Sequence, residues 1–269
     1  MIVRPFFLPA LAILALSGAA APIGQARAEQ PVLASVTPAR AVVPATMGGQ
    51  DCAVATKTAR LMGSLPRTAE KLRAGGELKI VAIGSSSTEG VGASEPSRAY
   101  PAQLERELAR RFPMSVVRIV NKGIGGELVR DMAKRLERDA IDQLPTLVIW
   151  QTGTNDANQG VSRQDFVAEL KAGIERLHAA DIDVLVLDPQ YTPRVAANGG
   201  GTYKGLFHQL PVDLKVAVFN RQDVMQAWVD SGKFTFAGML SQDRFHMNDR
   251  SYRCLAVVLG EAIEYAARD

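Results

Sequence analysis

The chain has 269 residues, of which 47% are hydrophobic and 22% charged. This balance describes a folded protein with an apolar core and excludes disordered and collagen-like chains. The 31 basic and 28 acidic residues leave a formal net charge of +3, and the basic residues are scattered along the chain. A nucleic-acid partner is therefore not expected, because it would require a concentrated basic patch.

Residues 1–28 have the pattern of an export signal. The single charge of Arg4 precedes an apolar run of small residues, and Ala26-Arg27-Ala28 offers the small-x-small pattern that signal peptidase cleaves. The alternative is a retained membrane anchor, because the uncharged stretch 6–25 is nearly long enough to cross a bilayer. A proline, a glycine and several alanines within it favour the signal. We therefore expect a periplasmic or secreted protein with no stable membrane insertion after signal removal.

Residues 29–50 are rich in Pro, Ala, Thr and Gly and lack periodicity, which predicts a linker and places the folded domain at residues 51–269. Beyond the linker, short β-rich apolar runs alternate with longer amphipathic ones. Strands are predicted at residues 78–83, 115–120, 146–151, 183–188 and 214–219. Helices are predicted at residues 100–111, 127–141, 162–180, 221–231 and 249–267.

The alternation of strands and helices predicts right-handed crossovers, and hence a three-layer α/β/α fold around a five-stranded parallel sheet. In such sheets the reactive groups lie at the carboxyl ends of the strands. The stretch 189–211, with glycines at 199–201, has the least regular pattern. It is predicted to be a loop that overhangs this end of the sheet.

Three predicted strands end in polar, glycine-rich segments. The first runs into Gly84-Ser85-Ser86-Ser87, where a serine hydroxyl can be exposed with little steric hindrance, as a nucleophile requires. The second continues into a glycine-rich segment at 123–126, whose backbone amides are possible hydrogen-bond donors. The third is followed by Asn155, whose side-chain amide can donate to an oxyanion. Each segment is also compatible with an ordinary turn.

The chain contains three histidines, and one of them has an acidic neighbour at a useful spacing. His178 falls late in a predicted helix and His208 in the irregular stretch, whereas His246 follows Asp243 by three residues. One turn of chain lets Asp243 accept the Nδ1 proton and leaves Nε2 free as a base. A metal site is the competing interpretation, but no second histidine or cysteine lies at ligand spacing, so no metal is expected.

These four segments, in this order, resemble the SGNH hydrolase superfamily, also called the GDSL esterases and lipases. The resemblance covers residues 78 to about 260 and implies a flavodoxin-like three-layer fold. The family pattern is Gly-Asp-Ser, then a glycine, then Gly-x-Asn-Asp, then Asp-x-x-His. By this resemblance the catalytic residues are the nucleophile Ser86, the base His246 and its orienting residue Asp243, and the oxyanion donors are Ser86, Gly126 and Asn155.

Two details of the resemblance need comment. Gly126 fits the oxyanion glycine better than Gly123 because of its place in the segment 121–126. Ser85 stands where the family usually has aspartate, and this change affects the hydrogen bonding of the turn more than the chemistry. The resemblance implies acyl-enzyme hydrolysis of a carboxylic ester without a cofactor.

The substrate is predicted less sharply. A polar overhang with Gln190, Tyr191 and Asn198 favours a short acyl ester, such as acetyl, on a glycan or small molecule. The alternative is a lysophospholipase or thioesterase with an apolar groove, for which residues 195, 206 and 207 are candidates. A non-catalytic envelope binding protein is the alternative from another class.

Cys52 and Cys254 are the two cysteines of the chain. An even count in an exported protein predicts a disulfide, which here would join the segment before the first strand to the last helix. The alternative is a pair of buried free thiols.

Overall fold

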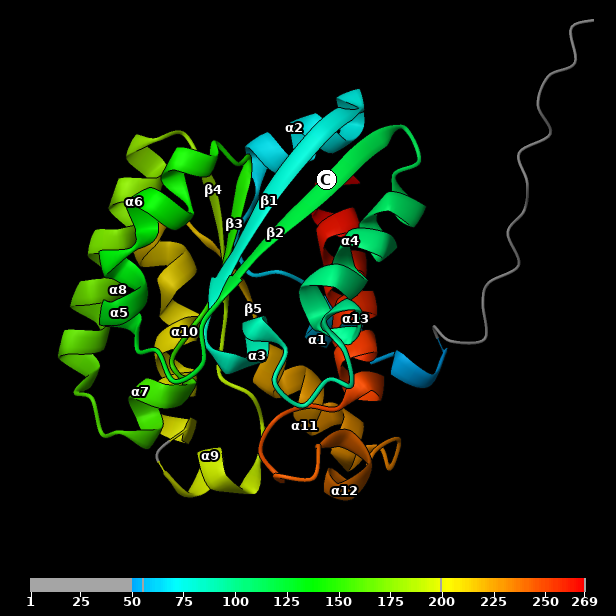
Figure 1. The fold of residues 1–269 in the computed structure, drawn as a ribbon, viewed down its shortest axis with the longest axis vertical. Coiled ribbons are helices and arrows are strands. Elements are labelled where there is room, and N and C mark those ends of the chain that lie inside the picture. Colours follow the sequence, from blue (N-terminus) through cyan, green and yellow to red (C-terminus); the bar gives the residue numbers. More distant parts are fainter. Residues whose placement is uncertain (1–49, 55, 199, 269) are drawn as a thin grey trace, which may run out of the picture. The chain divides into compact units, whose positions relative to one another are not determined.

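The computed structural model describes residues 50–54, 56–198 and 200–268, so the predicted signal and nearly all of the predicted linker lie outside the described residues. Its centre is a five-stranded sheet in which all neighbours are parallel, as predicted (Figure 1). The strand order is β2-β1-β3-β4-β5. The strands are β1 (Gly76–Gly84), β2 (Ser115–Gly123), β3 (Leu147–Gln151), β4 (Asp183–Leu187) and β5 (Ala217–Phe219).

Helices cover both faces of the sheet (Figure 1). One layer contains α1 (Thr56–Ala59), α2 (Pro66–Ala74), α4 (Tyr100–Arg111), α11 (Arg221–Asp230) and α13 (Asp249–Arg268). The other contains α5 (Val129–Lys134), α6 (Leu136–Asp139), α8 (Arg163–Ala179) and α10 (Gly200–Leu214). Successive strand residues enter opposite cores: Ile80 packs into the first and Val81 into the second. Burial on both faces explains why β3, β4 and β5 are almost continuously apolar, whereas the edge strand β2 carries polar residues and is partly exposed.

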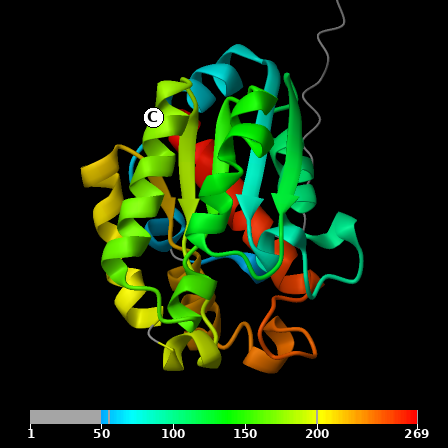
Figure 2. The same ribbon diagram turned by 60° about the vertical axis from the view of Figure 1, so that its left-hand side comes forward.

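Short helices follow the carboxyl ends of three strands. They are α3 (Ser86–Glu89) after β1, α7 (Thr154–Asn158) after β3 and α9 (Pro193–Ala197) after β4. Figure 2 shows the strand arrowheads pointing toward the end of the domain where these helices lie. A fourth short helix, α12 (Phe236–Met239), precedes the last helix, and single turns of 3-10 helix occupy Gln50–Cys52, Pro96–Arg98 and Ile141–Gln143. The parallel sheet thus gathers segments from distant parts of the sequence at one edge.

The prediction of a loop over residues 189–211 was wrong for most of its length. The segment contains α9 and most of α10, and Pro211 lies within α10. Tyr203, Phe207 and Leu210 are buried in the second core, at the spacing of one helix face. The glycines and the proline of this segment obscured its helical periodicity in the sequence. Because α10 continues to Leu214, β5 is shorter than the predicted strand.

The helix predicted at residues 127–141 is broken into α5, α6 and a turn of 3-10 helix. The break lies at Arg135, whose backbone leaves helical geometry at φ −107° and ψ 5°. Its buried guanidinium donates to Glu127, to Asp139 and to the carbonyl oxygen of Gly84. The amphipathic pattern predicts helix on both sides of Arg135. It carries no information about the hydrogen bonds of the Arg135 guanidinium, so it did not predict the break.

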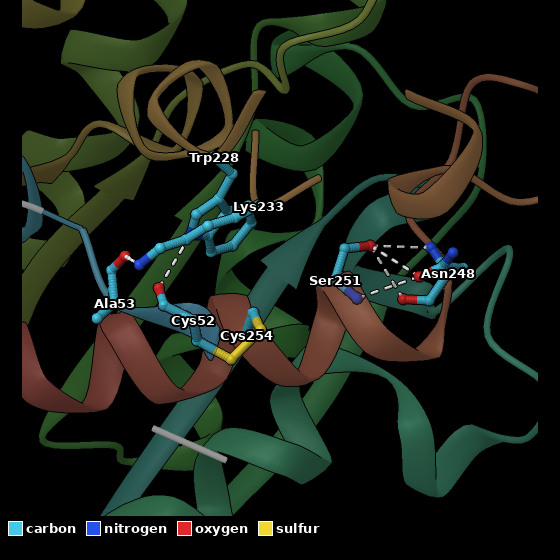
Figure 3. The surroundings of a disulfide bond; sticks show 7 residues. All are labelled: Cys52, Ala53, Trp228, Lys233, Asn248, Ser251 and Cys254. Carbon is cyan, nitrogen blue, oxygen red and sulfur yellow. Dashed lines mark hydrogen bonds between the residues drawn. A yellow bond between two sulfur atoms is a disulfide. The ribbon is translucent and has the colours of Figure 1, made fainter. Parts of the chain in front are cut away.

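Cys52 and Cys254 form a disulfide, with 4.9 Å between their Cα atoms. Both cysteines are buried, and the bond joins the segment before α1 to α13 (Figure 3). The indole Nε1 of Trp228 donates to the carbonyl oxygen of Cys52 at 2.9 Å, and Lys233 donates to that of Ala53. Within the described ranges, no helix combines the length and apolar character needed to cross a membrane.

Candidate active site

Ser86 is the first residue of α3, directly after β1 and the turn residue Ser85. Both the backbone amide and the hydroxyl of Ser85 donate to Oε1 of Gln151 at 3.1 Å, as does the hydroxyl of Thr88 at 3.1 Å. Gly84 is required beside them, because a Cβ at this position would overlap the Thr88 side chain. The turn is therefore fixed by a glutamine at the end of β3, and the serine that replaces the family aspartate takes part in it.

Ser86, His246 and Asp243 lie in one hydrogen-bonded chain. Nε2 of His246 is 2.7 Å from Oγ of Ser86, and its Nδ1 is 2.5 Å from Oδ2 of Asp243. The His246 side chain is 14% exposed and that of Asp243 43% exposed. This order of groups lets the imidazole accept the serine proton through Nε2 while the carboxylate accepts a hydrogen bond from the protonated Nδ1.

Asp243 is held in its ionised form. Partial burial raises the pKa of its carboxyl group, but the hydrogen bonds from Ser241, His246 and the backbone amides of Phe245 and His246 outweigh this effect. The hydroxyl of Ser241 donates at 2.6 Å, and both amides donate at 2.9 Å. The net pKa lies well below the usual range for aspartate. Such a carboxylate acts as a fixed acceptor for the imidazole and does not take up its proton.

The loop that carries Asp243 and His246 is braced from within. The amide of Ser241 donates to the carbonyl oxygen of His246 at 2.8 Å, and Leu240 pairs with Met247 in an isolated bridge. At the start of α13, the Asn248 amide donates to the Ser251 hydroxyl, and the Ser251 amide donates to Oδ1 of Asn248, both at 3.1 Å (Figure 3). This reciprocal capping fixes the point at which the loop enters the helix.

The other two polar strand ends meet beside Ser86. Gly126 is exposed and has φ +81°, a left-handed conformation that favours glycine. Gly125 lies against Ser86, since a Cβ built on it would be 3.8 Å from that of Ser86. Asn155 is half-buried, and its Nδ2 donates to the carbonyl oxygen of Glu127 at 2.9 Å. The amide-bearing residues expected to bind an oxyanion are thus on neighbouring segments.

The residues predicted to contact substrate differ in their placement. Gln190 is completely buried and hydrogen-bonded on both sides, so it does not line an open pocket as expected. Tyr191 is half-buried against Phe236, with 5.6 Å between the ring centroids. Asn198 is exposed and donates to Oδ1 of Asn158 at 3.1 Å. Over residues 50–54, 56–198 and 200–268, no group of three or more His, Cys, Asp or Glu side chains is placed to hold a metal ion.

Three residues that shape this site were not found from the sequence in these roles. They are Gln151, which fixes the turn before Ser86; Arg135, which anchors Glu127; and Gln190, which hydrogen-bonds to Ser87 and Phe245. A polar residue at the end of an otherwise apolar strand was a usable signal for Gln151. No local pattern distinguished Arg135 from the other arginines of amphipathic segments.

Two curated proteins share partial sequence similarity with the chain. It is 32% identical over 127 residues to the uncharacterized lipoprotein YqeF of Bacillus subtilis, covering 45% of this chain and 51% of that protein. It is 34% identical over 94 residues to an acetylxylan esterase of Geobacillus stearothermophilus, covering 32% of this chain and 42% of that protein. The matched regions thus span about half the length of these relatives.

Solved structures share the fold. A two-domain esterase active on acetylated mannans superposes with a TM-score of 0.67 at 19% identity, covering 81% of this chain and 58% of that one. A catalytic mutant of an acetylxylan esterase from Geobacillus stearothermophilus gives a TM-score of 0.62 at 21% identity, covering 70% of this chain and 95% of that one.

The model of the non-GDSL lipase-like family matches residues 51–269, a region that contains the whole sheet and every residue of the site described above. The match therefore covers most of the sequence. The chain belongs to the non-GDSL lipase-like family, within the SGNH type of lipolytic proteins.

Proposed function

We propose that the protein is an exported serine esterase that hydrolyses carboxylic esters through an acyl-enzyme. The observation that carries the proposal is the continuous hydrogen-bonded chain from Asp243 through His246 to Ser86. Family membership and this geometry support the same reaction class.

In the proposed mechanism, Nε2 of His246 takes the hydroxyl proton of Ser86 as the serine oxygen attacks the ester carbonyl carbon. The tetrahedral oxyanion accepts hydrogen bonds from the backbone amides of Ser86 and Gly126 and from the side chain of Asn155. His246 then gives its proton to the departing alcohol, and the ester bond to that alcohol breaks. Water, activated by the same imidazole, attacks the acyl-enzyme and releases the acid and the free serine.

A short acyl group on a glycan is the substrate class that we propose. Two similar proteins are an acetylxylan esterase and an esterase active on acetylated mannans. In this chain, a groove beside Asp243 is lined by Gly92 and Ala93 together with polar residues, among which Gln242 and Arg250 are exposed and available to sugar hydroxyl groups. By contrast, Val195 and Phe207, two of the three candidates for a long-acyl groove, are buried, and the third, Leu206, is partly buried against the second core. This burial favours acetyl esters over the lysophospholipase or thioesterase alternative.

Export is part of the proposal. The disulfide between Cys52 and Cys254 supports an oxidising compartment. The pattern of residues 1–28 and a curated relative named as a lipoprotein support the same location. Purification of the mature protein from the periplasm or culture medium, followed by N-terminal sequencing, tests this part separately from catalysis.

Labelling with a fluorophosphonate probe tests the chemistry. We expect the wild type to be labelled and Ser86→Ala to be unlabelled and inactive on p-nitrophenyl acetate. Ser85→Ala is the matched control, because the Ser85 backbone amide still donates to Gln151 in that variant, and its labelling should persist. Turnover by Ser86→Ala would overturn the assignment, and absence of labelling in the wild type would favour a non-catalytic binding protein.

The chain length of the acyl group is tested with p-nitrophenyl esters from acetate to palmitate, alongside acetylated xylan and mannan. We expect kcat/KM to fall as the acyl chain lengthens and acetate to be released from at least one glycan. A maximum at long chains would support the lipolytic alternative.

A further inference from the structure

Gln190 connects the two halves of the candidate active site. It follows β4 and is completely buried. Its Oε1 accepts a hydrogen bond from the hydroxyl of Ser87 at 2.8 Å, and its Nε2 donates to the carbonyl oxygen of Phe245 at 2.8 Å. Ser87 is the residue after the nucleophile Ser86, and Phe245 is the residue before His246. One amide group therefore touches the neighbours of both residues that exchange a proton in the proposed reaction.

The chemistry of this bridge requires a carboxamide. The Phe245 carbonyl oxygen can only accept a hydrogen bond, which fixes the NH₂ group of Gln190 on that side and leaves its oxygen toward Ser87. A carboxylate supplies the acceptor but no donor, and an apolar side chain supplies neither. Because the residue is buried, loss of either bond leaves a polar group without a partner.

The rest of the loop is tied mainly to itself. Two described hydrogen bonds connect residues 243–247 to the chain outside residues 238–251. One joins Phe245 to Gln190, and the other joins His246 to Ser86. The remaining bonds of residues 243–247 run to Ser241 or within this segment. The loop thus behaves as a braced unit that few hydrogen bonds connect to the rest of the chain, alongside the packing of Met247 in the first core and of Arg194 over the Phe245 ring.

We propose that Gln190 is a positioning residue that sets the distance between Nε2 of His246 and Oγ of Ser86. It does not touch the reacting atoms, and it acts through Ser87 and Phe245. The effect on turnover rests on the proposed esterase function, whereas the effect on the histidine geometry does not. A misplacement of about 1 Å in such a pair lowers turnover by about 100-fold.

Two substitutions of Gln190 and one of its hydrogen-bond partner Ser87 test the proposal. We expect Gln190→Ala to lower kcat for p-nitrophenyl acetate by about 10- to 100-fold, with KM within about twofold of wild type. Gln190→Glu keeps the acceptor for Ser87 but loses the donor to Phe245, so it should be impaired at least as strongly. Ser87→Ala leaves the bond to Phe245 in place and should lose less activity than either.

Gln222→Ala is the matched control. Gln222 is also a buried glutamine beside the sheet end, but its Oε1 has no hydrogen-bond partner among the described residues. We expect its kcat to stay within about threefold of wild type even if its thermal midpoint falls. If Gln222→Ala loses as much kcat as Gln190→Ala, or if the losses across all four variants simply follow thermal stability, the positioning role is wrong.

A spectroscopic readout separates this inference from the proposed function. The ¹⁵N chemical shift of His246 Nε2 reports its hydrogen bond to Ser86, and Ser86→Ala gives the reference value for the broken bond. We expect Gln190→Ala to move the wild-type signal toward that reference, whereas Gln222→Ala should not. An unchanged signal together with wild-type kcat would overturn the bridge. If the wild type hydrolyses no ester but the signal depends on Gln190, the proposed function fails and the bridge stands.

Discussion

At the scale of single residues, the position of the imidazole proton depends on Asp243. Its Oδ2 lies 2.5 Å from Nδ1 of His246, while its Oδ1 accepts from Ser241 and from two backbone amides. Because these bonds keep the carboxyl group ionised, Nδ1 is the protonated nitrogen and Nε2 remains an acceptor for the Ser86 hydroxyl. The tautomer follows from the hydrogen-bond network around the carboxylate.

Replacement of Asp243 by asparagine should separate orientation from folding. The amide of Asp243→Asn no longer enforces the productive tautomer, and we expect kcat for p-nitrophenyl acetate to fall by about 100- to 10,000-fold, with KM nearly unchanged. Steady-state kinetics and circular dichroism measure the two effects. A variant that fails to fold would show that Asp243 has a structural role instead.

The same substitution changes the dependence of stability on pH. The pKa of Asp243 is lower in the folded protein than in the unfolded chain, so the ionised carboxylate adds stability above the unfolded pKa of about 4, and this contribution is lost as pH falls further. Urea unfolding at about pH 6 and pH 3 should therefore show a larger loss of stability in the wild type than in Asp243→Asn. Equal losses would contradict the inferred pKa shift.

At the scale of elements, α8 has a glycine at the position where it packs against the Trp150 side chain of β3. The ring of Trp150 is fully buried, and a Cβ on Gly173 would overlap it. Gly205 in α10 is a useful contrast, because no atom other than those of its chain neighbours and its own helix backbone lies within 4 Å of the position its Cβ would take. Both glycines lie inside helices, but Gly173 is packed against a side chain whereas Gly205 faces open space.

Alanine substitutions at these positions should have opposite effects. We expect Gly173→Ala to lower the free energy of unfolding by about 1 to 3 kcal/mol, because overpacking displaces the indole. We expect Gly205→Ala to raise it by about 0.5 to 1 kcal/mol, because alanine loses less entropy in a helix. Urea denaturation measures both. Stabilisation by Gly173→Ala would show that α8 can shift without cost.

At the scale of the whole molecule, the disulfide closes a sequence separation of 202 residues between Cys52 and Cys254. Cys254 lies in α13, which follows the loop that carries His246 in the sequence. The carbonyl oxygen of Cys52 accepts a hydrogen bond from Trp228 (Figure 3). The disulfide bond therefore holds the segment before α1 against the last helix.

Removal of the disulfide should affect stability and not catalysis. Chain entropy predicts a loss of up to about 5 kcal/mol for a loop of this length, so a reducing agent or the double variant Cys52→Ala, Cys254→Ala should lower the thermal midpoint clearly. The kcat at 25 °C should stay within about twofold of that of the oxidised protein. A large fall in kcat without unfolding would show that the clamp also positions the His246 loop.

The sequence alone determined the parallel sheet and the positions of the polar strand ends. Apolar strands and amphipathic helices are local patterns, and parallel topology brings their carboxyl ends together. Ser86 and Asn155 were predicted at that edge from short motifs, and His246 was assigned to the same site through the family resemblance. The period of α10 was present at Tyr203, Phe207 and Leu210, but the glycines and Pro211 outweighed it in the prediction.

Only the tertiary structure decided what Gln190, Gln151 and Arg135 do. Gln190 has an unremarkable place in the sequence after a strand, and its role arises because Ser87 and Phe245 lie on opposite sides of its amide. These partners are 103 residues before and 55 residues after it. A hydrogen bond depends on distance and direction in space, and local periodicity carries no information about which distant groups the fold will place within 3 Å of a buried side chain.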